Sequence, residues 1–341
     1  MKLTWHRRSL KLSHPFKIAR RLDSSTDKEV LLIQIEHEGQ VGWGEAAPIS
    51  YYHQTLDSAE AALEKATPLL GSDPFGFEAI HEQLWDHISD QSATIAAIDG
   101  ALHDLCGKLL KIPVWRWLGV NRKKLPITSF TIGIDDLDVM AQKVREAAQY
   151  PILKVKIGTA KDGDILTTIR REAPDKILRV DANCGWTSEN VLAQCRQVAK
   201  FKVELIEQPT PAGEHSALPA VRAEHIAPLI ADESCVSVGD VLKCAGAFDG
   251  VNIKLSKCGG IRPALQMIHT ARSAGLKIML GCMVETSVGI AAAAQVAPLV
   301  DYVDLDGHLL LADDPFEGIG GAGGRLTLND RPGLGVVERL Q

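Results

Sequence analysis

Eight short β-rich runs recur at an even period through the last two-thirds of the chain. They end near Ile132, Lys156, Asp181, Glu207, Asp232, Lys254, Cys282 and Asp304. The spacing of neighbouring ends varies only from 22 residues (Asp232 to Lys254) to 28 residues (Lys254 to Cys282), and helix-like stretches lie between them. This alternation predicts an α/β fold with a (β/α)8 (TIM-type) barrel. An open doubly wound sheet would alternate in the same way, but eight even repeats favour closure.

The first third of the chain has a mixed α+β character. Its strand-like and helix-like segments are 29–37, 40–45, 55–70 and 93–110. A connection at 111–127 leads into the barrel pattern, and the tail after Leu311 returns to strands and turns. We therefore expect an α+β domain over 1–124, a barrel domain over 125–311, and packing of 312–341 back on the first domain.

Composition narrows the class of protein. The 341 residues carry a net charge of −6, and no long run of Lys and Arg is present, which argues against binding to nucleic acid. The seven cysteines are odd in number and never spaced as CxxC, so a reducing cytoplasm fits better than a disulfide framework. The N-terminus has no apolar signal region, and the most apolar late stretch, 288–300, is too short for a membrane span.

Charged residues stand where the predicted strands leave the barrel. Lys154 and Lys156 are one residue apart in "LKVKIG", so both side chains should point to the same face of a strand, among apolar neighbours that make the pair costly to bury. The next three runs end with Asp181 in "LRVDANCGW", Glu207 in "ELIEQPTP" and Asp232 in "LIADESC". Any one of these acids alone would be read as a solvated side chain or a helix cap.

The order of these charges along the strand ends indicates a functional site. Lys254 in "VNIKLSKCGG" follows the three acids, and Asp304 and Asp306 in "VDLDGHLLL" end the last run. Strand ends surround one mouth of a barrel, where three carboxylates would repel one another unless a cation such as Mg²⁺ or Mn²⁺ lay between them. A nearby metal and a second ammonium both disfavour the protonated form of a lysine, which can then act as a base near neutral pH.

The motifs "KVKIG", "VDAN", "EQP", "ADES", "NIKLSKCGG" and "DLDG" resemble those of the enolase superfamily, in the muconate-lactonizing-enzyme subgroup, and most closely those of the dipeptide epimerases. The resemblance covers nearly the whole chain. It implies a modified (β/α)8 barrel under an α+β capping domain built from the N-terminal third and the C-terminal tail. It also implies one Mg²⁺ per subunit, with Mn²⁺ as a substitute, and leaves a homo-oligomer open.

The resemblance implies an isomerase that inverts the α-carbon of the C-terminal residue of a dipeptide, by 1,1-proton transfer through an enediolate. Asp181, Glu207 and Asp232 would bind Mg²⁺, which stabilises the enediolate through the substrate carboxylate. Lys156 and Lys254 would be the two opposed acid/base groups, because removal of a proton from one face and its return to the other need a base on each side.

Three further residues receive roles from the same resemblance. Lys154 would help to stabilise the substrate carboxylate, and Asp304 with Asp306 would hold the ammonium of the dipeptide. Rivals on the same scaffold are a muconate-type cycloisomerase, an o-succinylbenzoate synthase and an N-acylamino-acid racemase, none of which has a substrate ammonium to bind. A non-catalytic metal-binding barrel is disfavoured because both lysines and all three acids are present.

Specificity is expected from the capping domain, whose substrate-covering loops in this family correspond to 14–29 and 45–54. Relatives that take Ala-Glu carry an arginine in the first loop, and alignment of "PFKIAR" places Asp23 near that position, just after Arg20 and Arg21. Asp23 would repel a glutamate side chain and favour an apolar or cationic one. A shift of two residues restores an arginine, and all three residues fit solvated loop charges as well.

The remaining candidates adjoin these motifs. Asn183 and Glu233 stand next to metal positions and would orient ligands, although exposure to solvent is an equal alternative. Lys257 fits a structural role better than a catalytic one. Cys282 and Glu285 follow the seventh strand and are expected to line the pocket. No histidine motif accompanies Cys282, so it is not expected to be a nucleophile.

Overall fold

The computed structural model describes residues 1–19 and 21–339, and the side chains of residues 21–25 also lie outside the description. Its largest element is an eight-stranded parallel sheet whose strands pair in chain order, from β4 to β11. The strands are β4 (Phe130–Ile132), β5 (Ile152–Lys156), β6 (Ile177–Asp181), β7 (Val203–Glu207), β8 (Leu229–Ala231), β9 (Gly250–Ile253), β10 (Lys277–Gly281) and β11 (Tyr302–Asp304). A parallel bridge between Thr128 and Val303 joins the first strand to the last, so the predicted barrel is confirmed.

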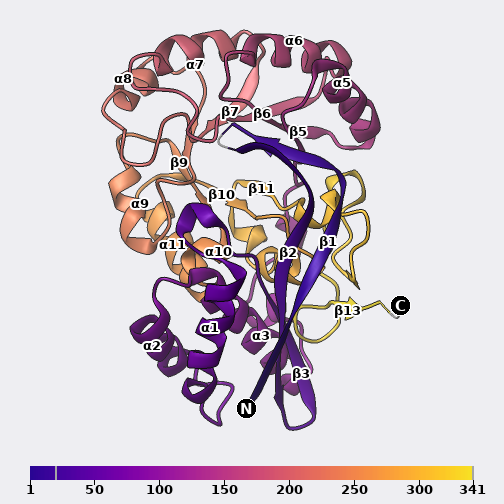
Figure 1. The fold of residues 1–341 in the computed structure, drawn as a ribbon. Coiled ribbons are helices and arrows are strands. Elements are labelled where there is room, and N and C mark those ends of the chain that lie inside the picture. The colour runs from indigo at the N-terminus through magenta and orange to yellow at the C-terminus, as the bar shows by residue number, and fades with distance from the viewer. Residues whose placement is uncertain (20, 340–341) are drawn as a thin grey trace.

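Helices follow the barrel strands and surround the sheet (Figure 1). They are α5 (Leu137–Glu146), α6 (Asp162–Glu172), α7 (Val191–Ala199), α8 (Leu218–Ala223), α9 (Val238–Cys244), α10 (Leu255–Cys258), α11 (Ile261–Ser273) and α12 (Ser287–Ala294). The expected eighth repeat is modified, because β11 leads into a 3-10 helix, η6 (Gly307–Leu310), and not into an α-helix. The chain then crosses to the N-terminal sheet, where the amide of Ala312 donates to the carbonyl of Lys11 at 2.8 Å.

The N-terminal third forms a three-stranded antiparallel sheet and four α-helices. The strands are β1 (Lys2–Ile18), β2 (Arg21–His37) and β3 (Gln40–Ala46), and the helices are α1 (Leu56–Ala66), α2 (Phe77–Ile88), α3 (Ser92–Leu110) and α4 (Val114–Trp117). The segments expected at 29–37 and 40–45 are joined by a tight turn, in which Glu38 and Gly39 both have positive φ, at 48° and 72°, as a two-residue hairpin turn requires.

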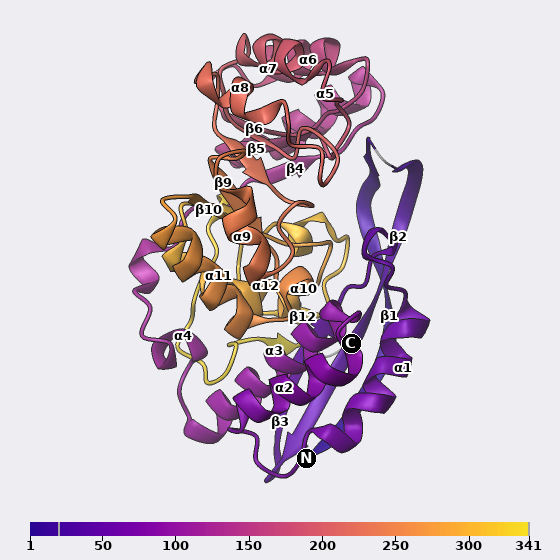
Figure 2. The same cartoon turned by 90° about the vertical axis from the view of Figure 1, so that its left-hand side faces the viewer.

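The first covering loop differs from its prediction. Residues 14–18 and 21–29 continue strands β1 and β2, which form one long hairpin that reaches the barrel (Figure 2). The register shifts after Lys11, and pairing resumes toward the tip, where Phe16 lies opposite Ser25 and Ile18 opposite Arg21. At this end the amide of Ile134 donates to the carbonyl of Lys17 at 3.0 Å. The strand β1 was not predicted because its largely exposed, charged face obscures the apolar alternation of a strand.

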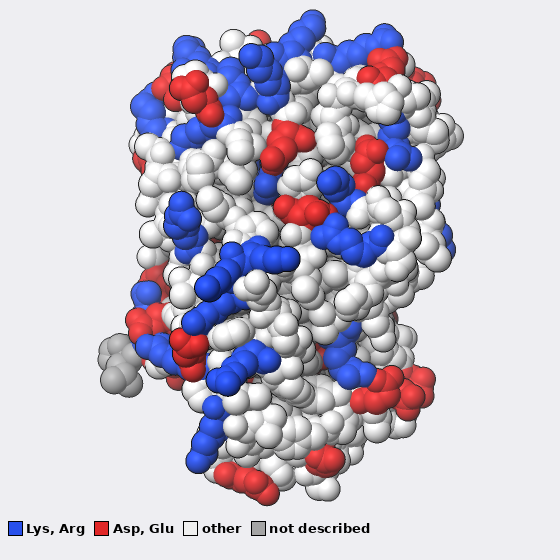
Figure 3. All heavy atoms as spheres, turned by 180° about the vertical axis from the view of Figure 1, so that it is seen from behind, with Lys and Arg blue, Asp and Glu red and all other residues white. Residues whose placement is uncertain are grey.

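The remaining short elements belong to connections and to the tail. They are β12 (Phe316–Glu317), β13 (Val337–Glu338), η1 (Ser50–Tyr52), η2 (Thr67–Leu69), η3 (Arg122–Lys124), η4 (Ala147–Gln149), η5 (Ala297–Leu299) and η7 (Ala322–Gly324). Within the described residues, no helix has the length and apolar character needed to cross a membrane. The face seen from behind carries both positive and negative side chains (Figure 3).

Helix α3 of the cap lies between the cap's own sheet and the barrel. All sixteen residues from Ser92 to Gly107 are buried, because the sheet of the cap covers one side and α10 and α12 of the barrel approach the other. Small residues make this contact close: a Cβ on Gly44 of β3 would come within 2.0 Å of the carbonyl oxygen of Ala97. The segment expected at 93–110 is therefore a helix whose residues 92–107 are buried on all sides, and its apolar residues Ile95, Ile98, Leu102 and Leu105 form one part of that surface.

The Gly44 contact yields a stability prediction. Gly44→Ala should destabilise the protein by about 1–3 kcal/mol, because the new methyl group overlaps a backbone oxygen that moves only with its helix. The matched control is Gly239→Ala in α9, where the nearest atom lies 3.7 Å away and little change, or a gain of up to about 1 kcal/mol, is expected. Urea-induced unfolding measures both changes, and equal midpoints for the two variants would contradict the packing described here.

Candidate active site

The two lysines of strand β5 do share one face. The Nζ atoms of Lys154 and Lys156 lie 3.2 and 2.7 Å from the same oxygen, Oδ2 of Asp181, and both residues are buried. Their burial is offset by carboxylates: Lys154 also contacts Oε2 of Glu207 and Oδ2 of Asp304, each at 2.7 Å. The predicted juxtaposition of the two lysines is thus present in the structure.

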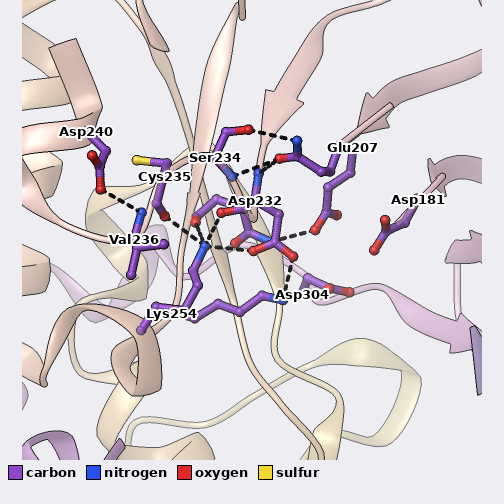
Figure 4. A network of polar contacts seen from close by, with 12 residues as sticks. Asp181, Glu207, Asp232, Ser234, Cys235, Val236, Asp240, Lys254 and Asp304 are labelled. Atoms are coloured by element: carbon purple, nitrogen blue, oxygen red, sulfur yellow. Dashed lines mark hydrogen bonds and ion pairs between the residues drawn. The ribbon is translucent and has the colours of Figure 1, made fainter. Parts of the chain in front are cut away.

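The three acids at the next strand ends converge (Figure 4). Asp181 ends β6, Glu207 ends β7 and Asp232 follows β8, and one carboxylate oxygen from each lies within 4.8 Å of the other two. All three are almost fully buried, with exposures of 0, 0 and 1%. Burial and the neighbouring carboxylate of Asp181 raise the pKa of Glu207 to about 7. Like charges confined in this way fit a cation site.

Polar neighbours hold the three acids in place. Oε1 of Glu207 accepts from the amide of Asn252 at 2.8 Å, and Oδ1 of Asp181 accepts from the backbone N–H of Asn183 at 2.9 Å. Asp232 lies between two lysines: Nζ of Lys254 donates to its Oδ2 at 2.8 Å, and Nζ of Lys257 donates to its Oδ1 at 2.7 Å. The backbone N–H of Asp232 donates to the side chain of Gln208, which also belongs to the "EQP" motif.

Sequence reasoning missed the part played by Asn252. Its signal was present, because Asn252 lies two residues before Lys254 in a buried strand and so shares its face. Lys257 was expected to be structural. Its ammonium is buried and also donates to the carbonyls of Asp232, Cys235 and Asn252, and none of these partners was predictable from the chain.

The donor set fits a hard divalent cation. Three carboxylates supply oxygen, the atom that Mg²⁺ and Mn²⁺ prefer. Oε2 of Glu207 has an ion-pair contact with Lys154 but no hydrogen bond, and the amide oxygen Oδ1 of Asn183 is buried without a hydrogen bond, so both oxygens have unused capacity as acceptors. Although burial lowers the pKa of both Lys154 and Lys254, the surrounding carboxylates raise it more.

Asp304 and Asp306 lie beside this cluster, at the seam where the barrel closes. Oδ1 of Asp304 accepts from the hydroxyl of Ser129 at 2.6 Å, and Oδ2 accepts from Lys154. Oδ2 of Asp306 accepts from the backbone N–H of Thr131 at 2.6 Å. Burial, together with the charge of Asp304, raises the pKa of Asp306 to about 7.

A cavity of about 200 Å³ connects these groups. Its barrel side carries charged and polar residues: Lys154, Lys156, Asn183, Asp232, Glu233, Lys254, Asp304 and Asp306. The cap contributes Asp27, Lys28 and mainly apolar side chains, among them Leu12, Phe16, Ile18, Ile49 and Tyr52. A charged floor under a largely apolar roof can bind a small molecule that has ionic groups at one end and a side chain at the other.

The remaining residues predicted for the site are Cys282, Glu285, Arg20, Arg21 and Asp23. Cys282 lines the cavity, and burial, together with Asp306 and Glu285, raises its pKa well above the usual range, so the thiol stays protonated. Glu285 is buried near the cap, and burial raises its pKa to about 7. Arg20 lies outside the described residues, as do the side chains of Arg21 and Asp23, whose backbone belongs to β2.

Two family models match the chain. Residues 2–119 match the mandelate racemase/muconate lactonizing enzyme N-terminal domain, and residues 136–339 match the enolase C-terminal domain-like model. Among relatives, L-Ala-D/L-Glu epimerase of Bacteroides thetaiotaomicron is 42% identical over 99% of this chain and 88% of its own. L-Ala-D/L-amino acid epimerase of a Maribacter species is 38% identical over 99% of both chains.

Solved structures agree in fold. The dipeptide epimerase of Enterococcus faecalis V583, complexed with Mg and the dipeptide L-Leu-L-Tyr, superimposes with a TM-score of 0.92 at 33% identity over 98% of each chain. The dipeptide epimerase of Cytophaga hutchinsonii, complexed with Mg and D-Ala-L-Val, gives a TM-score of 0.93 at 28% identity over 99% of this chain and 95% of its own. The matched models, the identity to full-length relatives and the barrel-and-cap fold agree: the chain belongs to the mandelate racemase/muconate lactonizing enzyme family of the enolase superfamily.

Proposed function

We propose that this protein is a Mg²⁺-dependent dipeptide epimerase that inverts the α-carbon of the C-terminal residue. The observation that carries the proposal is the placement of two lysines across one cavity. Lys156 ends β5 and Lys254 follows β9, and β5 and β9 are four strands apart in a barrel of eight, so the two ammonium groups approach from opposite sides. Epimerisation needs this arrangement, because the proton leaves one face of the carbon and returns to the other.

The proton path uses both lysines in opposite protonation states. For one substrate isomer, a neutral Lys156 removes the α-proton while the ammonium of Lys254 delivers a proton to the other face; for the other isomer the roles are exchanged. The acid partners of the two lysines, Asp181 and Asp232, lie on the arc of strands between them. This arrangement supports a reacting carbon held between the two lysines and above the acids.

Asp181, Glu207 and Asp232 would hold the metal. Bound Mg²⁺ supplies positive charge beside the substrate carboxylate, where negative charge grows as the proton leaves. Lys154 would be a second positive charge near the substrate carboxylate. Its contacts with Glu207 and Asp304 hold its ammonium in place, away from the reacting carbon. Asp304 and Asp306 then offer negative charge to the ammonium of the dipeptide, a group that the rival substrates on this scaffold lack.

The substrate class follows from the relatives and from the cavity. Relatives named for L-Ala at the first position support L-Ala-X dipeptides, with L-Ala-L-Glu among them. The apolar side chains that the cap contributes support acceptance of an apolar second residue as well. We place the capping domain at 1–124 with 312–341 and the catalytic barrel at 125–311. The seven cysteines are free thiols, which supports a cytoplasmic location.

The first prediction tests the reaction. In D₂O with Mg²⁺, the wild-type protein should incorporate deuterium at the α-carbon of the second residue of L-Ala-X dipeptides and produce the L,D isomer, as read by mass and by ¹H NMR. Lys156→Ala and Lys254→Ala should each abolish epimerisation, and each should retain exchange of only one isomer, because each lysine faces one side of the carbon.

N-succinyl amino acids are the control substrates for this experiment, since they lack the ammonium that Asp304 and Asp306 would bind. Faster exchange of N-succinyl amino acids than of every dipeptide would contradict the assignment. Epimerisation by Lys254→Ala at the wild-type rate would contradict the two-base mechanism.

The second prediction concerns the metal. Chelation should abolish activity and Mg²⁺ should restore it. Glu207→Gln should weaken Mg²⁺ binding in a calorimetric titration and lower activity by at least about 100-fold, because the growing charge loses its main support. Glu204→Gln is the matched control: it lies on the same strand, β7, but pairs with Arg179 away from the acid cluster, and should bind Mg²⁺ normally. Full activity in excess chelator, without tightly bound metal, would rule out this site.

The third prediction concerns the hairpin tip. If Asp23 meets the substrate side chain, Asp23→Asn should raise kcat/KM for L-Ala-L-Glu relative to L-Ala-L-Leu, because a like-charge contact out of water costs several kcal/mol and each 1.4 kcal/mol is about tenfold. Arg21→Met should lower the same ratio. Lys2→Met, at the exposed far end of β1, is the control. Unchanged ratios in both tip variants would make Asp23 and Arg21 surface charges without a role in recognition.

A further inference from the structure

The segment that carries Lys254 is seated against the cap. Lys254 directly precedes α10, which is followed by Gly259, Gly260 and helix α11. The segment is internally rigid, because the carbonyl of Lys254 accepts from the amides of Lys257 and Cys258 at 3.0 and 3.1 Å. Lys254, at one end of this segment, lines the cavity, and the other end of the segment contacts the cap.

Two hydrogen bonds join the outer end of the segment to helix α3 of the cap. The hydroxyl of Ser92 donates to the carbonyl of Ser256 at 2.8 Å. The amide of Ile261, at the start of α11, donates to Oδ2 of Asp99 at 2.6 Å. Since Gly260 has no side chain to cap this helix, the cap supplies the carboxylate from another part of the chain.

The two glycines of "KCGG" make this contact close. Their φ angles are +93° and +121°, a region that other residues rarely adopt. A Cβ on Gly259 would come within 2.6 Å of the ring of Trp85 on α2, and a Cβ on Gly260 would come within 2.4 Å of Asp99. The glycines therefore serve the approach of cap helices to the Lys254 segment, a role that the chemistry at the cavity does not explain.

Asp99 is itself fixed. It is fully buried, its Oδ1 lies 2.9 Å from Nε2 of His81, and its Oδ2 lies 3.3 Å from Nδ1 of His103. Burial alone would raise the pKa of Asp99, but His103 and His81 lower it more, so the carboxylate stays charged beside the N-terminus of α11. Asp99 is thus a rigid point of attachment.

The opposite lysine has a different relation to the cap. Lys156 is followed by Ile157 and Gly158, and Gly158 lies against Ala19 at the end of the long hairpin, where an added Cβ would come within 3.1 Å of the Ala19 side chain. The helical part of the cap thus meets the barrel on the side of Lys254, and the hairpin meets it on the side of Lys156 (Figures 1 and 2).

We infer that Asp99 is a positioning residue for Lys254: by holding the start of α11 against α3, it fixes the segment from which Lys254 projects. This inference rests on the proposed two-base reaction. Through this contact the cap would contribute to catalysis as well as to specificity, and the contact would act on the Lys254 face of the substrate. A displacement of about 1 Å of a reacting group can cost about a hundredfold in rate.

The test is isomer-specific exchange. Lys254→Ala identifies the isomer whose α-proton Lys254 removes, as the one whose exchange in D₂O it abolishes. Asp99→Asn should slow the exchange of that same isomer at least about tenfold relative to the other isomer. Asp104→Asn is the matched control, since Asp104 is a buried aspartate on the same helix that accepts from Trp43 and Leu334 and does not contact the Lys254 segment.

An equal loss for both isomers in Asp99→Asn, or the same asymmetry in Asp104→Asn, would overturn the inference, because a merely structural effect lowers both exchange rates together. If Asp99→Asn does not fold, Ser92→Ala decides the question by the same ratio: asymmetry toward the Lys254 isomer supports the inference and equality overturns it. Absence of exchange of either isomer by the wild-type protein would instead contradict the proposed function itself.

Discussion

The buried charge cluster at the barrel mouth is the constraint on which the rest of the structure depends. Carboxylates of Asp181, Glu207 and Asp232 lie within 4.8 Å of one another, where two unit charges repel by roughly 3 kcal/mol per pair at an effective dielectric constant of about 20. Lys154 and Lys254 offset part of this repulsion by direct contact with the acids. Such a cluster stabilises a fold poorly, but it is well suited to binding a cation and a charged substrate.

Because the cluster itself stabilises the fold poorly, the rest of the protein must hold its charged side chains in place. Parallel strands in a closed barrel bring side chains from distant parts of the sequence to one mouth. A second set of polar residues, including Asn252, Gln208 and Lys257, fixes the carboxylates from behind. The cap covers the cavity with apolar side chains. It also holds the segment after Lys254 through the hydrogen bond from Ile261 to Asp99.

Local sequence pattern was sufficient to predict the barrel and the charged strand ends. The repeat of the strands and the charged residues that end them can both be recognised within short segments of sequence. The contact between Asp99 and Ile261 spans 162 residues and has no local signal, so only the fold reveals it. Strand β1 was missed for a related reason: it is held by pairing with β2, while its own charged face obscures the apolar alternation. The return of the chain to the cap after β11 agrees with the strand and turn character expected after Leu311.

A crystal structure of the protein with Mg²⁺ and an L-Ala-X dipeptide would test the proposed metal site and the two-lysine mechanism together. We expect the ion on Asp181, Glu207 and Asp232, and the α-carbon of the second residue between the Nζ atoms of Lys156 and Lys254, with the substrate ammonium near Asp304 and Asp306. An ion bound elsewhere, or an α-carbon with both lysines on the same side, would contradict it.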